Sequence, residues 1–263
     1  MSKTVKATLI AGAIILCIGI VAVLVAGISN GWNFDTLKWE EKSYECEQSA
    51  DITDIDLRFD AGKLKIEFYD GETIKVEYSE NERLTYDVEV VNRTLSISAD
   101  FHWHLQFLWF NRFPETKVYI PKDMSLGLKM EINAGAITVS DGTFNDVDVK
   151  INAGVISMNN LNCNSFNLQL NAGAVNIAHL TSQKNFVADI NAGALDITRL
   201  VCDDISLDLS AGAANLTIAG KKSDYTIRTE VSAGSCNVRS QSGGSKRLDV
   251  DVSAGSANIN FAE

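Results

Sequence analysis

A tripeptide that ends in Ala-Gly recurs along the chain at nearly constant spacing. It occurs eight times and uses eight of the 18 glycines. From Gly135 onward, successive glycines of the motif lie 19, 19, 20, 19, 22 and 21 residues apart. A fixed period of this length is typical of stacked structural repeats. The copies are Asp60-Ala61-Gly62, Asn133-Ala134-Gly135, Asn152-Ala153-Gly154, Asn171-Ala172-Gly173, Asn191-Ala192-Gly193, Ser210-Ala211-Gly212, Ser232-Ala233-Gly234 and Ser253-Ala254-Gly255.

Apolar residues alternate with other residues on both sides of each glycine. The third residue before the glycine is apolar, as in Ile132 and Ile151, and apolar residues return two and four positions after it, as in Ile137 and Val139. A period of two predicts β-strands. The phase shifts by one residue across the motif, so the chain must turn or bulge there, and glycine tolerates the dihedral angles that this needs. Each repeat therefore predicts one coil of an all-β, parallel β-solenoid.

The repeats divide the chain into a regular and an irregular part. Residues 129–263 read as regular coils and contain no proline, which is typical of strands that are paired on both edges. Residues 45–128 hold the early copy at Asp60-Ala61-Gly62 among less regular strands, and we expect them to form atypical coils that cap the stack. Since no linker separates the two parts, residues 45–263 are predicted to form one domain.

The N-terminal segment predicts a membrane anchor. Residues 7–28 carry no charge, and a helix of this length is about 33 Å long, enough to span a bilayer. A cleaved signal peptide, or a lipoprotein signal at Cys17, is the alternative, although signal-peptide apolar regions are shorter. Residues 1–6 would be a cytoplasmic tail and residues 29–44 a juxtamembrane linker. The basic residues that flank the two ends of the apolar segment slightly favour an N-terminus inside the cell, with the C-terminal domain outside the cell membrane.

The charge of the chain excludes one class of partner. With 23 basic and 34 acidic residues, the net charge is −11. Binding of nucleic acid requires a surplus of basic groups, so no nucleic-acid partner is expected. We expect part of the negative charge to lie in a column of outward side chains four positions before each glycine: Glu131, Lys150, Gln169, Asp189, Asp208, Glu230 and Asp251.

The last four members of this column are acids. Asp189, Asp208, Glu230 and Asp251 are candidate contacts for a cation or a basic partner, because stacked carboxylates about 5 Å apart repel one another. A solvated acidic face is the alternative. Closely spaced carboxylates also serve glycosidases, so a carbohydrate-active enzyme using Asp189, Asp208 or Glu230 is a rival hypothesis.

The residue that opens each tripeptide predicts a structural ladder. In consecutive regular coils this residue is an asparagine, and amide side chains stacked in register can hydrogen-bond from coil to coil. The four members of the predicted corner ladder are Asn133, Asn152, Asn171 and Asn191.

An aromatic insert interrupts the pattern at residues 101–113. It contains Trp103, Phe107, Trp109 and Phe110. Such an insert can be an exposed loop that docks on a membrane or a partner, or a plug buried over the first coils. The chain has three histidines and no arrangement typical of a nucleophilic triad or a metal site. We therefore predict no catalytic residues, no cofactor and no metal.

The Ala-Gly corner repeat, the strand Val118-Tyr119-Ile120-Pro121 and the short N-terminal apolar segment resemble a family called the putative adhesins. These are bacterial β-strand repeat proteins, anchored in the membrane or exported, whose function is unknown. The resemblance covers about residues 45–263 and implies a cell-surface β-solenoid without catalysis. We expect an interaction, adhesin-like or envelope-structural module that meets a protein or polysaccharide, with a membrane sensor as a further alternative.

We also expect self-association through an uncapped C-terminal coil, because an open strand edge invites pairing.

Overall fold

The structure is a computed structural model that describes residues 38–47, 49–101 and 114–262. Residues Glu40–Glu263 form one compact unit of the chain. The predicted membrane segment 7–28 and residues 102–113 of the aromatic insert lie outside the described residues. Within the described ranges, no helix is both long and apolar enough to cross a bilayer.

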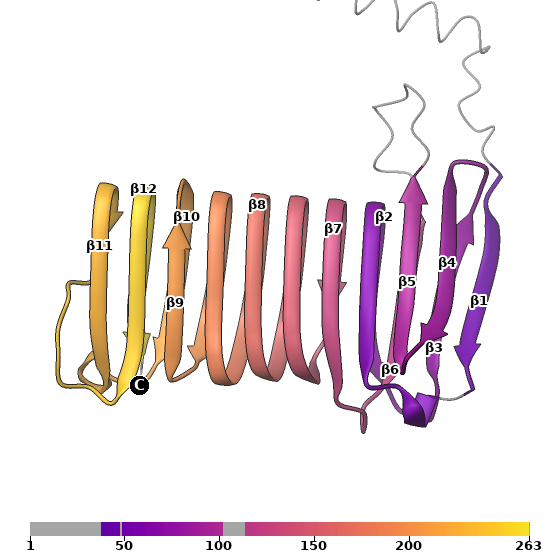
Figure 1. The fold of residues 1–263 in the computed structure, drawn as a ribbon, viewed down its shortest axis with the longest axis horizontal. Coiled ribbons are helices and arrows are strands. Elements are labelled where there is room, and N and C mark those ends of the chain that lie inside the picture. Colours follow the sequence, from indigo (N-terminus) through magenta and orange to yellow (C-terminus); the bar gives the residue numbers. More distant parts are fainter. Residues whose placement is uncertain (1–37, 48, 102–113, 263) are drawn as a thin grey trace, which may run out of the picture. The chain divides into compact units, whose positions relative to one another are not determined.

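The predicted parallel β-solenoid is confirmed in the unit Glu40–Glu263 (Figure 1). Four elements follow one another along its regular part. Neighbouring coils pair in parallel with glycine opposite glycine, as in Gly135↔Gly154, and the earlier Gly62 pairs in the same way with Gly135. Each coil has a first arm before the glycine corner and a second arm after it. The elements are β7 (Leu126–Val139), β8 (Gly142–Val201), β9 (Asp204–Leu209) and β10 (Gly212–Ala219).

At one end of the stack, the order of coils in space differs from their order in the chain. Strand β2 (Asp54–Tyr69) pairs with β7 on one side. On its other side it pairs with β5 (Thr94–Phe101) and β6 (Glu115–Pro121), which come later in the sequence. The coil made by β5 and β6 therefore lies outside β2, and β2 is held between two neighbours.

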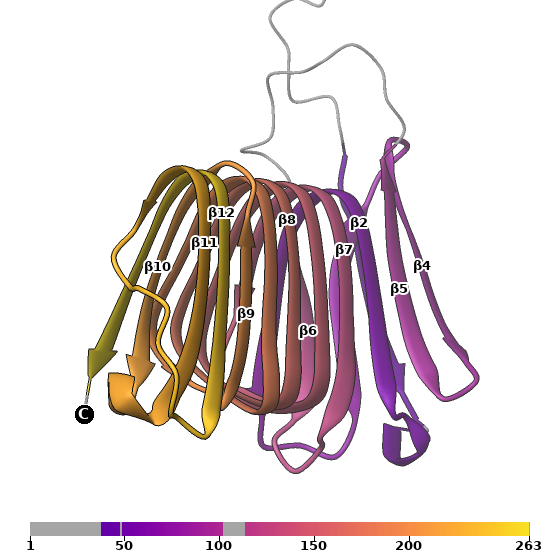
Figure 2. The same cartoon turned by 60° about the vertical axis from the view of Figure 1, so that its left-hand side comes forward.

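The same exchange occurs at the other end (Figure 2). Strand β12 (Lys246–Ala262) pairs with β9 and β10 on one side and with β11 (Tyr225–Cys236) on the other. The expectation of an uncapped C-terminal coil is therefore wrong, because the last coil of the chain is not the last coil of the stack. The outermost coil is β11, which follows the short 3-10 helix η3 (Lys222–Asp224).

Side chains and a loop cover part of this outer end. The N–H of Ile227 donates to the carbonyl of Gln241 at 2.8 Å, and the N–H of Gln241 donates back at 2.9 Å. The Asn237 amide bonds both backbone groups of Ile259, at 2.7 and 2.9 Å. Asn237 thus takes the place of a strand neighbour beside the end of β12. These contacts reduce the number of unpaired edge groups that could recruit another chain.

Antiparallel strands cover the opposite end, where coils alone were expected. Strand β4 (Leu84–Val91) pairs antiparallel with β5. Strand β3 (Ile74–Glu80) pairs antiparallel with β6, and β1 (Glu40–Cys46) pairs with β3. A second 3-10 helix, η1 (Ser49–Asp51), lies between β1 and β2. Residues 45–128 thus combine two coils with hairpin strands, because short turns between them reverse the chain.

The inward side chains of both arms form a continuous apolar core between the first arms and the second arms. They include Ile132, Ile151, Leu170, Ile190, Leu209, Val252, Ile137, Ile156, Val175, Leu195, Leu216 and Ile259, all of which are buried. Val231, at the equivalent position of β11, is 44% exposed. It belongs to the outermost coil, so no further coil covers it.

The glycine corners bring successive backbones into very close contact. At Gly154, Gly173 and Gly212 a Cβ atom would lie 2.0–2.3 Å from the carbonyl oxygen of the glycine one coil away. These residues also have φ angles between 122° and 145°, which side-chain-bearing residues rarely adopt. Glycine is therefore required both by the dihedral angles and by the space between coils.

Three Gly→Ala variants separate these two requirements. Gly62 has φ 142° and, among the described residues, no atom within 4 Å of the position that a Cβ would take, whereas Gly135 lacks the positive φ but its Cβ would meet the Gly62 oxygen at 2.4 Å. Gly173 has both constraints, with φ 122° and a contact at 2.0 Å. We expect Gly62→Ala to lower the free energy of unfolding by about 1–3 kcal/mol. Gly173→Ala should cost clearly more than Gly62→Ala.

Chemical denaturation of the three variants measures these differences. Gly135→Ala reports the cost of crowding without the positive φ. Equal stability of Gly62→Ala and Gly173→Ala would contradict the close approach of the coils, because crowding at Gly173 would then contribute nothing.

Candidate functional site

A line of side-chain hydrogen bonds runs along the corner of the stack. Asn152 donates to Asn133 and Asn171 donates to Asn152, each at 2.6 Å, and Asn191 donates to Asn171 at 2.7 Å. Asn133 in turn donates to the Asp60 carboxylate at 2.8 Å. Each asparagine therefore donates one amide N–H toward the β2 end, where a carboxylate, which only accepts, terminates the line. Such a line can form only between coils that are stacked in register.

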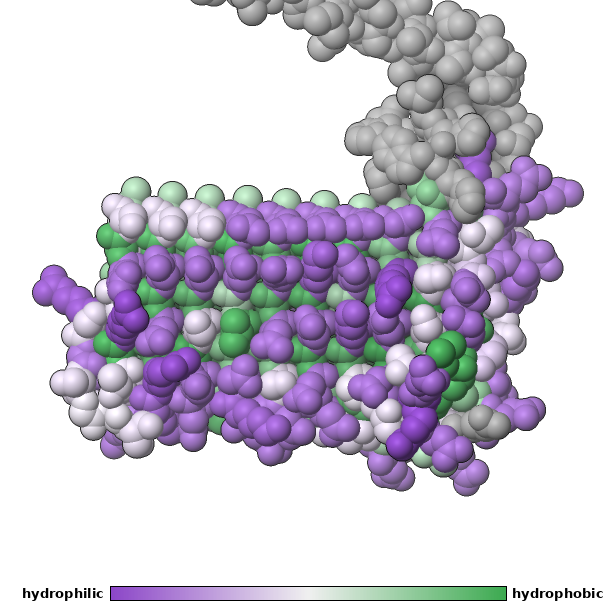
Figure 3. All heavy atoms as spheres, in the orientation of Figure 1, coloured by the Kyte–Doolittle hydropathy of each residue, from purple (hydrophilic) through white to green (hydrophobic). Residues whose placement is uncertain are grey.

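The four acids of the predicted column lie on neighbouring coils, but not in chain order. Strand pairing places Asp189 beside Asp208, Asp208 beside Asp251, and Asp251 beside Glu230. The exchange of β11 and β12 causes this order. Figure 3 shows hydrophilic side chains arranged in rows that cross the coils on this face of the unit.

The carboxylates of this column differ in their electrostatic surroundings. Burial, followed by the charges of Asp189 and Asp251, raises the pKa of Asp208. Glu230 forms an ion pair with Arg228, so its charge is compensated. At the other end of the column, a hydrogen bond and ion pair with Lys150 at 2.8 Å lower the pKa of Glu131. Negative charge is therefore least compensated at Asp189 and Asp208, because the Asp251 carboxylate also interacts electrostatically with Arg228.

The described residues do not assemble a metal site from the acids. Within 38–47, 49–101 and 114–262, no group of three or more His, Cys, Asp or Glu side chains is arranged to hold a metal ion. His179 is exposed, and its Nδ1 lies 2.5 Å from the Asn160 amide oxygen. His102 and His104 lie outside the described residues.

A groove of about 580 Å³ lies on the first-arm face, at the start of the arms of several successive coils. Strands β2, β5, β7 and β8 contribute to it. Its polar lining combines carboxylates, ammonium groups, amides and hydroxyls. The lining residues are Asp54, Ile55, Asp56, Thr94, Gly127, Leu128, Lys129, Asp146, Val147, Asp148, Ser165, Asn167, Lys184 and Asn185.

A local irregularity shapes this groove. The register between β7 and β8 shifts between Leu126 and Leu128, so the pairing is broken at Gly127. A Cβ at Gly127 would lie 2.2 Å from Oδ1 of Asp54, so any side chain there would displace that carboxylate. The missing side chain thus leaves the space that the Asp54 carboxylate occupies at the floor of the groove. Next to it, the Ser165 hydroxyl donates to Asp146 at 2.5 Å, and Lys129 lies 3.9 Å from Asp56.

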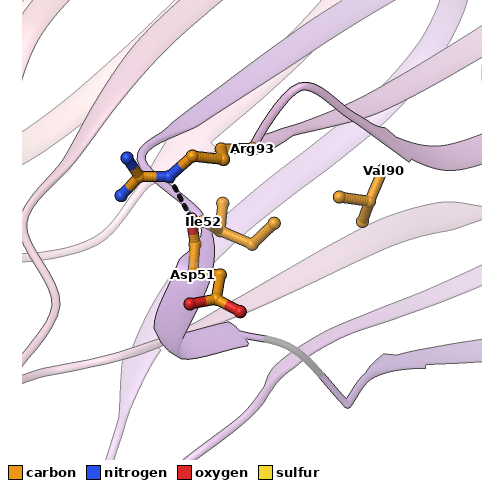
Figure 4. Close-up of a pocket in the computed structure, with 4 residues that line it drawn as sticks. All are labelled: Asp51, Ile52, Val90 and Arg93. Atoms are coloured by element: carbon orange, nitrogen blue, oxygen red, sulfur yellow. Dashed lines mark hydrogen bonds between the residues drawn. The ribbon is translucent and has the colours of Figure 1, made fainter.

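A second hollow, of about 550 Å³, lies beside the turn between β4 and β5 and is lined by Asp51, Ile52, Val90 and Arg93 (Figure 4). Arg93 and the preceding Asn92 have φ angles of 66° and 51°, as a tight hairpin turn requires. The Arg93 Nε donates to the Asp51 carbonyl at 2.9 Å. The arginine therefore ties the hairpin turn to helix η1, which is a structural role.

Comparison with known proteins places the chain in a family. The model of the family described as Toastrack DUF4097 matches residues 52–263, most of the chain. The chain belongs to the Toastrack DUF4097 family. No curated protein matches it significantly.

Several solved structures are similar to this Toastrack chain. A candidate cell adhesion protein from Clostridium sporogenes is 16% identical, with a TM-score of 0.38, over 86% of this chain and 100% of that one. A candidate adhesin from Bacteroides fragilis is 14% identical, with a TM-score of 0.43, over 86% and 97% of the two chains. A candidate lipid-binding protein from Parabacteroides distasonis is 14% identical, with a TM-score of 0.27, over 85% and 97%. None of these names is that of an enzyme.

The structure separates the predicted site residues of the Toastrack chain into three sets. The asparagines lie together at the corner, and the four acids lie together on the first-arm face. Trp103, Phe107, Trp109 and Phe110 lie outside the described residues. The groove was not predicted. The only sequence signal for it is Gly127, a glycine outside the Ala-Gly motif that lies within an alternating strand pattern, which is a known sign of a bulge.

A pair of substitutions in the acidic column tests its electrostatics. The raised pKa of Asp208 means that the folded state holds its proton more tightly than the unfolded state. The stability that this group contributes is therefore lost as pH rises above 3.8, which is the ordinary pKa of an aspartate carboxyl. We expect Asp208→Asn to increase stability at pH 7 and to lose this advantage below about pH 4.

Glu131→Gln provides the matched control with the opposite sign. Because Lys150 lowers the pKa of Glu131, its removal should decrease stability at pH 7, and this deficit should shrink as pH falls below the ordinary value of 4.5. Both effects should weaken at high salt. Urea denaturation at several pH values measures them, and a loss of stability in Asp208→Asn at pH 7 would exclude the proposed repulsion.

Proposed function

We propose that this Toastrack protein is a non-enzymatic binding module, held at the cell surface by its N-terminal segment, with an adhesin-like or envelope-structural role. The observation that carries the proposal is the set of outward side-chain columns on in-register coils. Strand pairing keeps equivalent positions next to each other, as in Asp189↔Asp208 and Asp251↔Glu230. Similar groups therefore recur about every 4.8 Å across the faces of the unit.

A surface of this kind suits an extended partner made of repeated units. Each contact with an exposed polar side chain is weak, but many contacts along one partner add up through their high effective concentration. The backbone ladder holds the columns in fixed positions, so little conformational entropy is lost on binding. Proteins and polysaccharides of the cell surface are partners of this extended type.

A catalytic role for the acids receives less support. Asp189, Asp208 and Glu230 lie outside the groove lining, and Glu230 lies two coils from Asp208 and is ion-paired with Arg228. A glycosidase would need two carboxylates on opposite sides of one bound sugar. The acids instead form one line along the same face.

Membrane anchoring by residues 7–28 is part of this proposal. Two charges in the middle of the segment should disfavour insertion, since each costs about 2.5–3.5 kcal/mol at the centre of a membrane helix. We expect the Leu16→Arg/Ile19→Arg double variant to leave the membrane fraction, while a Ser2→Arg variant, outside the apolar segment, should remain in it.

Protease treatment of intact cells then tests display and orientation. With a C-terminal tag on the full chain, the proposal predicts that protease removes the tag from intact cells. Protection of the tag until the cells are lysed would place the domain inside the cell and contradict the proposal.

A further inference from the structure

We infer that the groove formed by β2, β5, β7 and β8 binds an extended, neutral, hydroxyl-rich glycan. This inference rests on the proposed binding function and names the ligand class. The groove runs across the strands, because its lining comes from successive coils, with Asp54 beside Gly127 and Asp146 bonded to Ser165 nineteen residues later. From Asp54 to Asn185 it crosses five neighbouring coils, a distance of about 19 Å at the usual strand spacing.

The mixture of groups in the groove favours a neutral ligand over a charged one. The lining has four carboxylates, from Asp54, Asp56, Asp146 and Asp148, and two ammonium groups, from Lys129 and Lys184. Asp56 is ion-paired with Arg58 and Lys129, and Asp146 accepts from Ser165. Asp54 and Asp148 can therefore accept hydrogen bonds from a ligand, the lysines can donate them, and Asn167 can do both. A polyanion would meet the carboxylates and a polycation would meet the lysines. A sugar hydroxyl both donates and accepts, so it can pair with every one of these groups.

The spacing of the coils along the groove restricts the class of ligand further. Successive coils present new donors and acceptors at about 4.8 Å. In an extended β-1,4-linked pyranose chain, each sugar advances by a comparable length, so successive sugars can meet successive coils. A ligand of several sugars should therefore bind more tightly than a disaccharide, and the gain should end once the oligomer is as long as the groove.

Gly127 leaves room for the Asp54 carboxylate to lie against the floor of the groove, where a Cβ would meet its Oδ1 at 2.2 Å. It is buried within the floor, and the pairing irregularity at Leu126 and Leu128 surrounds it. An alanine there would push against the Asp54 carboxylate, which is the mobile end of an exposed side chain, rather than against backbone. Gly127→Ala is therefore expected to obstruct the groove with a smaller loss of stability than a corner-glycine substitution.

Binding of defined oligosaccharides to the full chain in lipid nanodiscs tests this inference. The probes are hexamers and dimers of β-1,4-linked glucose and of β-1,4-linked N-acetylglucosamine, followed by calorimetry. We expect at least one hexamer to bind, and to bind more tightly than its dimer. Removing two exposed groove side chains in Asp148→Ala/Lys184→Ala should weaken binding about ten-fold, as expected for the loss of one to two hydrogen bonds.

Two further variants test whether binding depends on the groove. Asn176→Ala/Thr198→Ala removes two exposed polar side chains from the second arms of the same β8 and should bind like the unchanged chain. Gly127→Ala should bind more weakly, with its melting temperature recorded in parallel. Groove-dependent binding of heparin or polylysine in place of the hexamers would overturn the inference in favour of a charged partner.

The inference and the proposed function can fail separately. If neither hexamer binds, or if the Asp148→Ala/Lys184→Ala variant binds normally, the groove is not a glycan site. Cells displaying that variant would then still adhere to surfaces as well as cells with the unchanged chain, and the binding function would stand. Loss of adhesion in cells without the protein is the separate measure of the binding function.

Discussion

The close approach of backbones at the glycine corners is the constraint on which the rest of this structure depends. Because glycine stacks on glycine with no space for a Cβ, neighbouring coils can pair only in one register. A slip of one residue would place alanine in the corner and turn the apolar side chains outward. The core, the asparagine ladder and the outward columns all follow from that register.

The exchanged coils at the two ends determine which side chains become neighbours. At one end β2 is enclosed by later strands, and at the other β12 is enclosed by an earlier one. The outermost coil at one end is formed by β5 and β6, and the outermost coil at the other end is formed by β11. Each of them is preceded and followed in the chain by coils that lie further inside the stack. The acidic column is one consequence, since Asp251 lies between Asp208 and Glu230.

The sequence was sufficient to predict the parallel coils, because the Ala-Gly period and the change of phase at each corner are local signals. The hydrogen-bonded asparagines occupy the corner positions that the same period indicates. The exchange of β11 and β12 could not be predicted, since both strands carry the same Ser-Ala-Gly motif and either order satisfies the pattern. The groove depends on Gly127 and on a shifted pairing beside it; the glycine is visible in the sequence, but the shifted pairing and the residues that it brings together are not visible without knowing which coils are adjacent.

Disulfide formation between substituted cysteines tests the order of coils most directly. In a chain whose native cysteines are replaced by serine, Asp208→Cys/Asp251→Cys places the two cysteines opposite each other on neighbouring strands. Their Cα atoms are then about 4.8 Å apart, which is within the range of a disulfide. Asp208→Cys/Glu230→Cys places them two strands apart, beyond that range. We expect rapid, intramolecular oxidation of the first pair alone. Oxidation of the second pair and not the first would show that the coils follow chain order, which would contradict the exchanged ends and the acidic column built on them.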